Sequence, residues 1–532
     1  MSLTRETLKH TAVYAGANVA LKLAGLILLP VYSRLFDTEG YGILGMLEAS
    51  LGLLGILLTY GFQNAVLWLY HDVEPHRRDA VYVTAVGLMA VTGMALVAIP
   101  LLFSSSLSGL LLGDSRYASL IALSLVTLVV DVTAQSAATY HIIHQRSTFY
   151  SALSLLSLAL SLGLNILFII VWRFGLVGFC LSSLFVALVR CALFTASALR
   201  RTRLQFDLSM AWLLFRFQAP LIPAEFLAFV SRQSERFLVR YLISLDGVGI
   251  LEMAYKFPPL LNYFFGSPFL LTWRATTVRV AEQADGPRVI GGMLTGYAFG
   301  MLFLGLLMAV NLGPLITLLT PPSFWPSVRI AKVEVLNTLL SAGIGYVQFG
   351  LLYRHRTRRL AAIKTAGAIA KLVLSAVLIG LFGLAGAAYA SLCVYACMLA
   401  WVGHDAQRVY RLDIEWSRLA VLAATALGVY LLIDALMRWP AGPVPRVGEI
   451  VGPMIHGLAG AWPVEGTRVG RWLTFLVWER EKLGALIVNT AVALSYGAVL
   501  FWVRPQLARH LVSRGAGALA EWAALRRRSP SV

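Results

Sequence analysis

Gly40-Tyr-Gly-Ile-Leu-Gly-Met46 returns 207 residues later as Gly247-Val-Gly-Ile-Leu-Glu-Met253, with five of the seven residues identical. A second pair of stretches lies 208 residues apart: Phe174-Gly-Leu-Val-Gly178 and Phe382-Gly-Leu-Ala-Gly386. Two matches in nearly the same register indicate a duplicated unit of about 200 residues. A membrane protein built from two such copies commonly places its working site between them.

The composition is that of a membrane protein. Of the 532 residues, 58% are hydrophobic and 13% are charged, and the mean hydropathy is +0.75. This is more apolar surface than one water-soluble core can bury. Apolar runs that can cross about 30 Å of hydrocarbon as helix predict an all-α integral membrane protein with about fourteen transmembrane helices. The predicted spans are 11–33, 41–66, 80–103, 117–140, 149–172, 175–199, 209–242, 247–273, 291–313, 329–353, 360–381, 384–403, 417–437 and 482–503.

The loop charges predict the orientation of the chain. Lys and Arg near span ends stay in the cytoplasm, and here they occupy every second loop, as at Arg77-Arg78 and Arg200-Arg201. We therefore expect both termini in the cytoplasm. With an even number of spans in each copy, the repeat is parallel: 1–208 and 209–416 are two six-helix lobes around a central cleft. Residues 417–503 add two helices joined by the periplasmic loop 438–481, and 504–532 form a basic cytoplasmic tail.

Several classes of function find no support in the sequence. The net charge of +18 does not indicate nucleic-acid binding, because the basic residues are dispersed over loops and helices. His141-x-x-His144 has no third ligand nearby and predicts no zinc site. The four cysteines lie inside predicted spans, where they fit as packing residues. We expect no metal and no other cofactor.

Ionised side chains inside the spans are the candidate functional residues. An ionised group at the bilayer centre costs roughly 3 kcal/mol unless it faces a cavity or a partner. An excess of cations therefore predicts a cationic cleft for an anionic ligand. The cations chosen for this role are Lys22, Arg232, Arg236, Lys256 and Lys371.

Two carboxylates and some local pairs qualify this interpretation. Glu48 and Asp131 are candidates for gating or for coupling to H⁺ or Na⁺, with helix packing as the alternative for each. Local pairing of Arg232 with Glu235, and of Lys256 with Glu252, would neutralise about half of the charged set. It leaves Lys22 and Lys371 without a local carboxylate.

Prolines predict bends in two spans. Gln218-Ala-Pro-Leu-Ile-Pro223 lies in the span 209–242, and Pro258-Pro259 lies in the next one. Each proline removes a helical hydrogen bond. The bends serve either as hinges or to fit a curved neighbour.

An ordered set of motifs resembles one known family. Leu29-Pro-Val-Tyr-Ser-Arg34 and Glu39-Gly-Tyr-Gly42 are followed by Ala219-Pro-Leu-Ile-Pro223 and Ser234-Glu-Arg236, and then by Gly247-Val-Gly249 and Ala254-Tyr-Lys256. This order resembles the bacterial polysaccharide flippases, the O-antigen and exopolysaccharide transporters of the multidrug/oligosaccharidyl-lipid/polysaccharide exporter superfamily. The similarity spans residues 1–416. Where the family commonly has Asp-Arg, this chain has Glu235-Arg236, which keeps the charges.

The resemblance implies a transporter of the bacterial inner membrane. Its substrate would be a polyprenyl-diphosphate-linked oligosaccharide, moved from the cytoplasmic to the periplasmic leaflet through a cationic lumen. The resemblance also implies contact with membrane lipids, and a polysaccharide polymerase and glycosyltransferases as partners. The chain would not be an enzyme.

Two other functions stay open. A multidrug or cation antiporter of the same superfamily would share the fold but should carry unpaired carboxylates in its cavity. A membrane glycosyltransferase or sugar polymerase could use Asp37-x-Glu39 as a catalytic acid. An acidic residue before glycine is also typical of a helix start, and no acid/base site accompanies it.

Overall fold

The computed structural model describes position 25 and residues 28–59, 62–202, 205–219, 222–438 and 485–494. Within these ranges the chain is helical with connecting turns and contains no strand. Nine of the helices described there are long and apolar enough to cross a membrane. The prediction of an all-α, multi-pass membrane protein is therefore confirmed. Lys22, most of the first span, the loop 438–481 and the basic tail lie outside the described residues.

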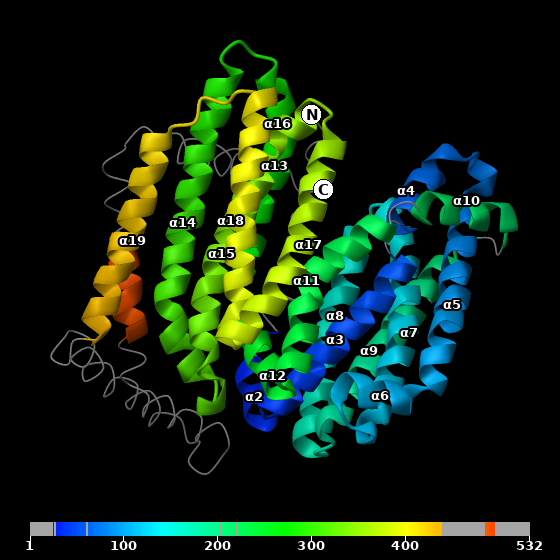
Figure 1. Ribbon diagram of the computed structural model, residues 1–532. Helices are drawn as coiled ribbons and strands as arrows, with labels where there is room; N and C mark the ends of the chain where they lie inside the picture. The colour runs from blue at the N-terminus through cyan, green and yellow to red at the C-terminus, as the bar shows by residue number, and fades with distance from the viewer. Residues whose placement is uncertain are drawn as a thin grey trace, which may run out of the picture. The chain divides into compact units, whose positions relative to one another are not determined.

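Most predicted spans correspond to a single helix (Figure 1). The long apolar helices are α5 (Arg78–Leu102), α7 (Ala118–Ile143), α8 (Ser147–Asn165, continued by a π-helical turn), α9 (Gly175–Leu199), α14 (Gly286–Leu319), α15 (Ser327–Val347), α17 (Thr357–Phe382), α18 (Leu384–Val409) and α19 (Trp416–Arg438). The other helices are α2 (Leu29–Leu35), α3 (Thr38–Thr59), α4 (Phe62–Asp72), α6 (Ser104–Leu112), α10 (Leu208–Gln218), α11 (Ile222–Leu242), α12 (Leu245–Ala254), α13 (Ser267–Ala281) and α16 (Phe349–Tyr353).

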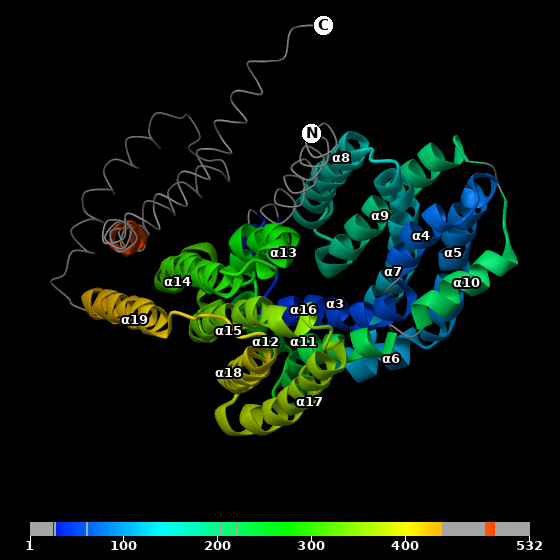
Figure 2. The same cartoon turned by 90° about the horizontal axis from the view of Figure 1, so that it is seen from above.

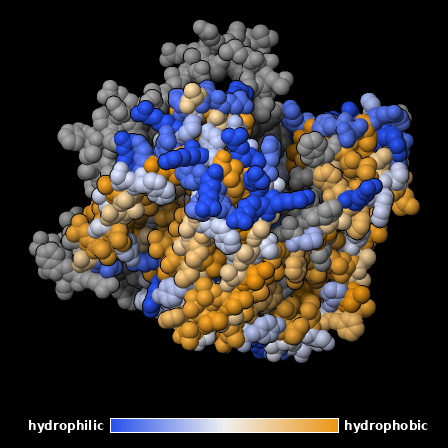
Figure 3. Space-filling model, turned by 45° about the horizontal axis from the view of Figure 1, so that its top comes forward, coloured by the Kyte–Doolittle hydropathy of each residue, from blue (hydrophilic) through white to orange (hydrophobic). Residues whose placement is uncertain are grey.

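The surface of the helices carries large apolar side chains. Figure 3 shows hydrophobic residues over most of the lower part of the visible face and hydrophilic residues gathered across its upper part. Leu102 and Leu381, for example, are 82% and 70% exposed. Contiguous exposed apolar surface of this extent is typical of protein that faces lipid.

The chain forms two compact units. The first contains Met1–Lys256, Leu319–Ile330 and Ala361–Val394, and the second contains Phe257–Leu318, Ala331–Leu360 and Tyr395–Val532. Helices α11 and α12 belong to the first unit because they pack against α3. These packing units do not test the six-helix lobes 1–208 and 209–416, which stay a prediction.

Not every predicted span is a single helix. The span 41–66 contains most of α3 and the first residues of α4, and two longer spans are also divided. The span 209–242 is divided into α10 and α11. The span 247–273 is divided into α12, a turn through Pro258-Pro259, a π-helical segment Asn262–Gly266 and α13. Proline lacks the N–H that an α-helix needs and restricts the residue before it. Here Pro223 lies in the first turn of α11, and Pro258-Pro259 follow the end of α12, so these prolines lie at helix ends and not inside a bent helix.

Helix α10 runs across the ends of the neighbouring helices of its unit (Figures 1 and 2). It packs on α4 and α5 through a buried face that includes Met210 and Leu214. Trp212 and Phe215 stack on the opposite, exposed side. A short helix with aromatic residues on one face is typical of the membrane–water interface.

The matched sequence stretches share local backbone structure. Gly175 and Gly383 both have a left-handed backbone, with φ of +57° and +60°. Gly175 is the first residue of α9, and Gly383 immediately precedes α18. Asp37 and Ser244, 207 positions apart, cap α3 and α12 by accepting from the N–H groups of Gly40 and Gly247 at 2.8 and 3.0 Å. The cap explains Asp37 as a helix start.

Helices α3 and α12 are in direct backbone contact, and they lie next to each other in Figure 2. A Cβ on Gly42 would overlap the carbonyl oxygen of Leu245, and a Cβ on Gly249 would overlap that of Thr38. Adding 207 to the numbers of Gly42 and Thr38 gives Gly249 and Leu245, so each contact is the repeat-related copy of the other. The two copies of the motif therefore meet each other through a reciprocal contact, the pattern expected around a two-fold axis.

Candidate substrate site

A cavity of about 380 Å³ lies in the first compact unit. Helices α3, α7, α9 and α12 supply most of its wall, and its size falls in the range of small-molecule sites. Its lining mixes aromatic and aliphatic side chains with hydroxyl groups and three charges. The lining residues are Gly25, Tyr32, Tyr41, Leu44, Gly45, Leu47, Glu48, Leu51, Ser124, Thr127, Phe179, Cys180, Ser183, Glu252 and Lys256.

Lys256 and Glu48 are the exposed charges of this cavity. Lys256 lies just beyond the C-terminal end of α12, in the turn that leads to Pro258. Glu48 lies in the middle of α3 and forms no ion pair within the described part of the chain. Both side chains can reach a ligand without first losing a partner among the described residues.

Glu252, the third charge of the cavity, is buried and paired. Nε of Arg236 on α11 contacts Oε1 of Glu252 on α12, and the Arg236 guanidinium also donates to the side chain of Gln233. Arg236 and Glu252 are only 11% and 5% exposed in their side chains. The pair places a guanidinium directly behind the cavity wall.

A second buried cluster surrounds Glu235, the neighbour of Arg236 in sequence. Lys371 Nζ on α17 lies 3.1 Å from Oε1 of Glu235, and Ser391 Oγ on α18 donates to the same oxygen at 2.6 Å. Tyr255 donates its hydroxyl to Oε2 at 2.5 Å. Glu235 thus has donors on both oxygens, which satisfies a buried carboxylate.

The family model described as polysaccharide biosynthesis protein matches residues 7–273. The match covers 267 of 532 residues, half of the chain, and includes every lining residue of the cavity. The chain belongs to this family. Among curated proteins, no sequence matches this polysaccharide biosynthesis protein.

Solved structures of one superfamily share the fold of this polysaccharide biosynthesis protein. The Lipid II flippase MurJ, in an inward closed conformation, has a TM-score of 0.67 at 10% identity, over 93% of this chain and 100% of that chain. An inward-facing multidrug resistance MATE family transporter of the MOP superfamily has a TM-score of 0.59 at 13% identity, over 75% and 99%. The Vibrio cholerae MATE transporter VcmN, as a mutant, has 0.52 at 14%, over 76% and 97%. At such identities the likeness establishes the fold alone.

The structure of this family member brings some predicted site residues together and separates others. Lys256 and Glu48 share the cavity, with Arg236 behind its wall. Arg232 is half exposed and pairs with Glu225 on its own helix at 2.7 Å. Lys371 lies in the separate cluster around Glu235. Their role in substrate binding stays a prediction.

The expected partners of these charges were wrong in two cases. Arg232 pairs with Glu225 instead of Glu235, and Glu252 pairs with Arg236 instead of Lys256. Lys371, for which no local carboxylate was expected, has Glu235 from another helix. Spacing along one helix identifies partners only within that helix, whereas two of these three pairs join different helices.

The remaining predicted residue, Asp131, pairs with Arg190. Arg190 Nη1 on α9 donates to Asp131 Oδ1 on α7 at 3.0 Å, and Gln135 donates to Oδ2 at 2.8 Å. Sequence analysis overlooked Gln135, Tyr255 and Ser391. Ser391 had a visible signal, since it belongs to the repeated Ser-Leu pair that follows Phe382–Gly386.

The family motif Leu29–Arg34 has a structural use. Ser33 Oγ and Arg34 Nη1 donate to the carbonyl oxygen of Leu319 at 3.3 and 3.2 Å. Leu319 is the last residue of α14, where helical carbonyls lack a partner and attract cations. Arg34 therefore caps a helix end.

Proposed function

We propose that this protein is a flippase for polyprenyl-diphosphate-linked oligosaccharides. It moves them from the cytoplasmic to the periplasmic leaflet of the bacterial inner membrane, for the synthesis of cell-surface or exported polysaccharide. Membership of the polysaccharide biosynthesis protein family supports this proposal, as does a fold shared with a lipid II flippase. In this proposal the protein is a transporter without catalytic activity, and it works beside glycosyltransferases and a polymerase.

The observation that carries the proposal is the exposed ammonium of Lys256 in a cavity among apolar helices. A diphosphate cannot enter hydrocarbon alone, so the protein must replace its hydration with cations and polar groups. Lys256 is placed to do so, whereas the Arg236 guanidinium behind the wall is neutralised by Glu252 and would act only after release from it. Lys22, expected on the first span, would contribute a further cation, and Lys371 and Arg232 would act after release from their present partners.

Alternating access would carry the head group across. The predicted lobes 1–208 and 209–416 rock about it while the polyprenyl tail stays in lipid. Glu48, an exposed carboxylate in the same cavity, is the candidate for coupling to H⁺ or Na⁺. Both termini lie in the cytoplasm in this proposal.

The test measures flipping of an extracted undecaprenyl-diphosphate-linked oligosaccharide in proteoliposomes that contain the purified full-length protein. Lys256→Glu should slow flipping at least tenfold, since it replaces a favourable charge at the diphosphate with a repulsive one. Arg358→Glu, exposed in the first turn of α17 and outside the cavity, is the control for reversal of a positive charge and should flip at the rate of the wild type. Equal rates for all three proteins would contradict the proposed site.

A multidrug or cation antiporter is the second candidate. It is favoured by the exposed carboxylate of Glu48 and by the fold shared with MATE family transporters. Purified protein that bound ethidium more tightly than undecaprenyl diphosphate, and lost this binding in Glu48→Gln, would support the antiporter and contradict the flippase.

A further inference from the structure

The pair Asp131–Arg190 lies near the middle of two long apolar helices, α7 and α9. The Arg190 guanidinium and the Gln135 amide each donate to one oxygen of the Asp131 carboxylate. The two charged side chains nevertheless remain 31% and 32% exposed. Charged residues at this depth commonly pair with each other and face the protein interior or a water-filled cavity, and they often mark the path of a substrate.

The pair continues the wall of the cavity. Ser124 and Thr127 on α7 line the cavity, as does Ser183 on α9. Asp131 follows Ser124 by seven residues, and Arg190 follows Ser183 by seven. Seven residues make almost two turns, so each charged residue lies on the cavity-lining face of its helix, about 10 Å farther along.

The second copy of the repeat lacks this pair. Under the 208-residue shift that relates Gly175 to Gly383, Arg190 corresponds to Met398 on α18. Helix α15, the counterpart of α7, has no Asp, Glu, Lys or Arg between Val335 and Val347. The repeated helix packing therefore does not require charged residues at these positions, which favours a role in binding.

We propose that Asp131, Gln135 and Arg190 form a subsite for sugar hydroxyl groups of the transported substrate. The subsite deepens the proposed flippase function and rests on it. A carboxylate accepts from hydroxyls, and guanidinium and amide groups donate to them in fixed planes. Arg190 has five N–H groups, of which the bond to Asp131 takes one. Because the pair is neutral overall, it suits the uncharged hydroxyls of the glycan, while the ammonium of Lys256 in the cavity suits the diphosphate.

The test compares two probes with purified full-length protein in nanodiscs. One probe is undecaprenyl diphosphate. The other is the undecaprenyl-diphosphate-linked oligosaccharide, extracted from cells that synthesise it. The double variant Asp131→Asn, Arg190→Gln keeps the net charge and an amide pair. It should weaken binding of the glycosylated lipid about tenfold, the loss of one charge-assisted hydrogen bond, and leave binding of the sugar-free lipid unchanged.

Two further variants keep the result interpretable. Gln135→Leu should also weaken only the glycosylated lipid, although it leaves the ion pair intact. Thr133→Val, whose hydroxyl bonds to the carbonyl of Val129 on its own helix, should bind both lipids like the wild type. Equal losses for both lipids, or no loss for either, would overturn the sugar subsite. Failure of the wild type to bind either lipid would instead overturn the proposed function.

Discussion

At the residue scale, Glu235 shows how one carboxylate organises several helices. Lys371, Ser391 and Tyr255 all direct polar groups to it, from α17, α18 and the end of α12. The ionised pair is buried, so its attraction offsets a large desolvation cost only because both oxygens are satisfied. The cluster is therefore a geometric constraint, which fixes where α11 lies relative to its neighbours in the same unit.

The reciprocal glycines Gly42 and Gly249 impose a second constraint at this scale. Each brings the backbone of α3 and α12 closer than any side chain would allow. Glycine costs helix stability, and here close backbone approach is the reason for it. This is the physical origin of the sequence repeat around residues 40 and 247.

We expect Gly249→Ala to destabilise the protein by about 1–3 kcal/mol, the usual cost of overpacking. The added Cβ would overlap the carbonyl oxygen of Thr38. The measurement is thermal unfolding in detergent. Gly403→Ala is the control, because among the described residues no atom outside its own helical backbone lies within 4 Å of the added Cβ. A Gly249→Ala protein as stable as the control would contradict the close contact of α3 and α12.

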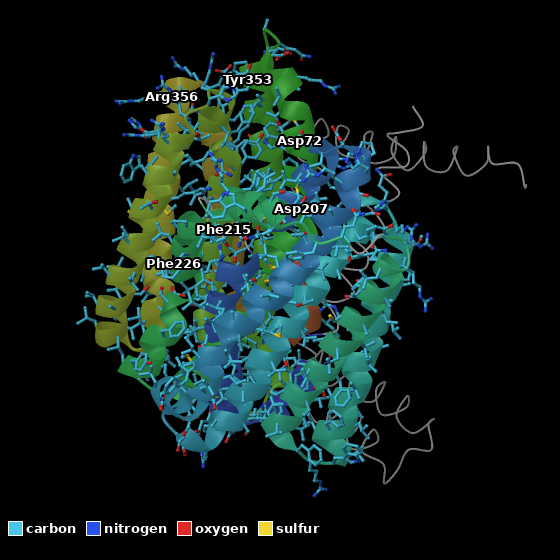
Figure 4. All side chains as sticks on the ribbon, turned by 90° about the vertical axis from the view of Figure 1, so that its right-hand side faces the viewer. Asp72, Asp207, Phe215, Phe226, Tyr353 and Arg356 are labelled. Carbon is cyan, nitrogen blue, oxygen red and sulfur yellow. The ribbon has the colours of Figure 1, made fainter. Side chains whose placement is uncertain are left out.

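At the element scale, α10 depends on its first residues. Asp207 caps the helix by accepting from Ser209, and it also accepts from Arg77 Nη2 at 2.6 Å. Figure 4 labels Asp207 and Phe215, which mark the two end portions of this helix. Bonds from Ser209 and Arg77 lower the pKa of Asp207 to about 2.

This lowered pKa predicts how the attachment of α10 depends on pH. A carboxyl with a depressed folded-state pKa stabilises the fold above its unfolded pKa, near 4, and loses that contribution as pH falls toward 2. The protection factors of the α10 amides, which compare their exchange with that of an unstructured peptide at the same pH, should therefore stay high at pH 5 and fall between about pH 4 and 2. Asp207→Asn should remove this pH dependence, because its side chain stays neutral. The same pH profile in both proteins would contradict the role of Asp207.

At the scale of the whole molecule, the chain passes repeatedly between two compact units. The first of these passages falls at Lys256–Phe257, directly before Pro258-Pro259 and next to the cavity. A helix break at this point joins the candidate substrate site to the second unit through a single turn. Lys256 is therefore adjacent to a segment in which hydrogen bonds between residues three apart replace the α-helical pattern, as from Leu260 to Phe257 and from Leu261 to Pro258.

The charge distribution over the loops predicts the topology of the molecule. With both termini in the cytoplasm, alkaline phosphatase fused after Val532 should be inactive, because it folds only in the periplasm. Phosphatase inserted in the loop 438–481 should be active. The physical reason is the retention of Lys and Arg on the cytoplasmic side. An active C-terminal fusion would contradict the orientation and the even number of spans.

The membrane environment, most of the long helices and the repeat could be predicted from the sequence. Hydrophobic runs and glycine motifs are local properties, so α9 and α5 appear at or within two residues of their predicted bounds. Local reasoning also found the charged residues, but not their partners. Tertiary structure alone decided that Lys371 reaches Glu235, that Arg236 reaches Glu252, and that α10 leaves the span. The reason is that an ion pair between helices depends on their packing and register, which no spacing within one helix contains.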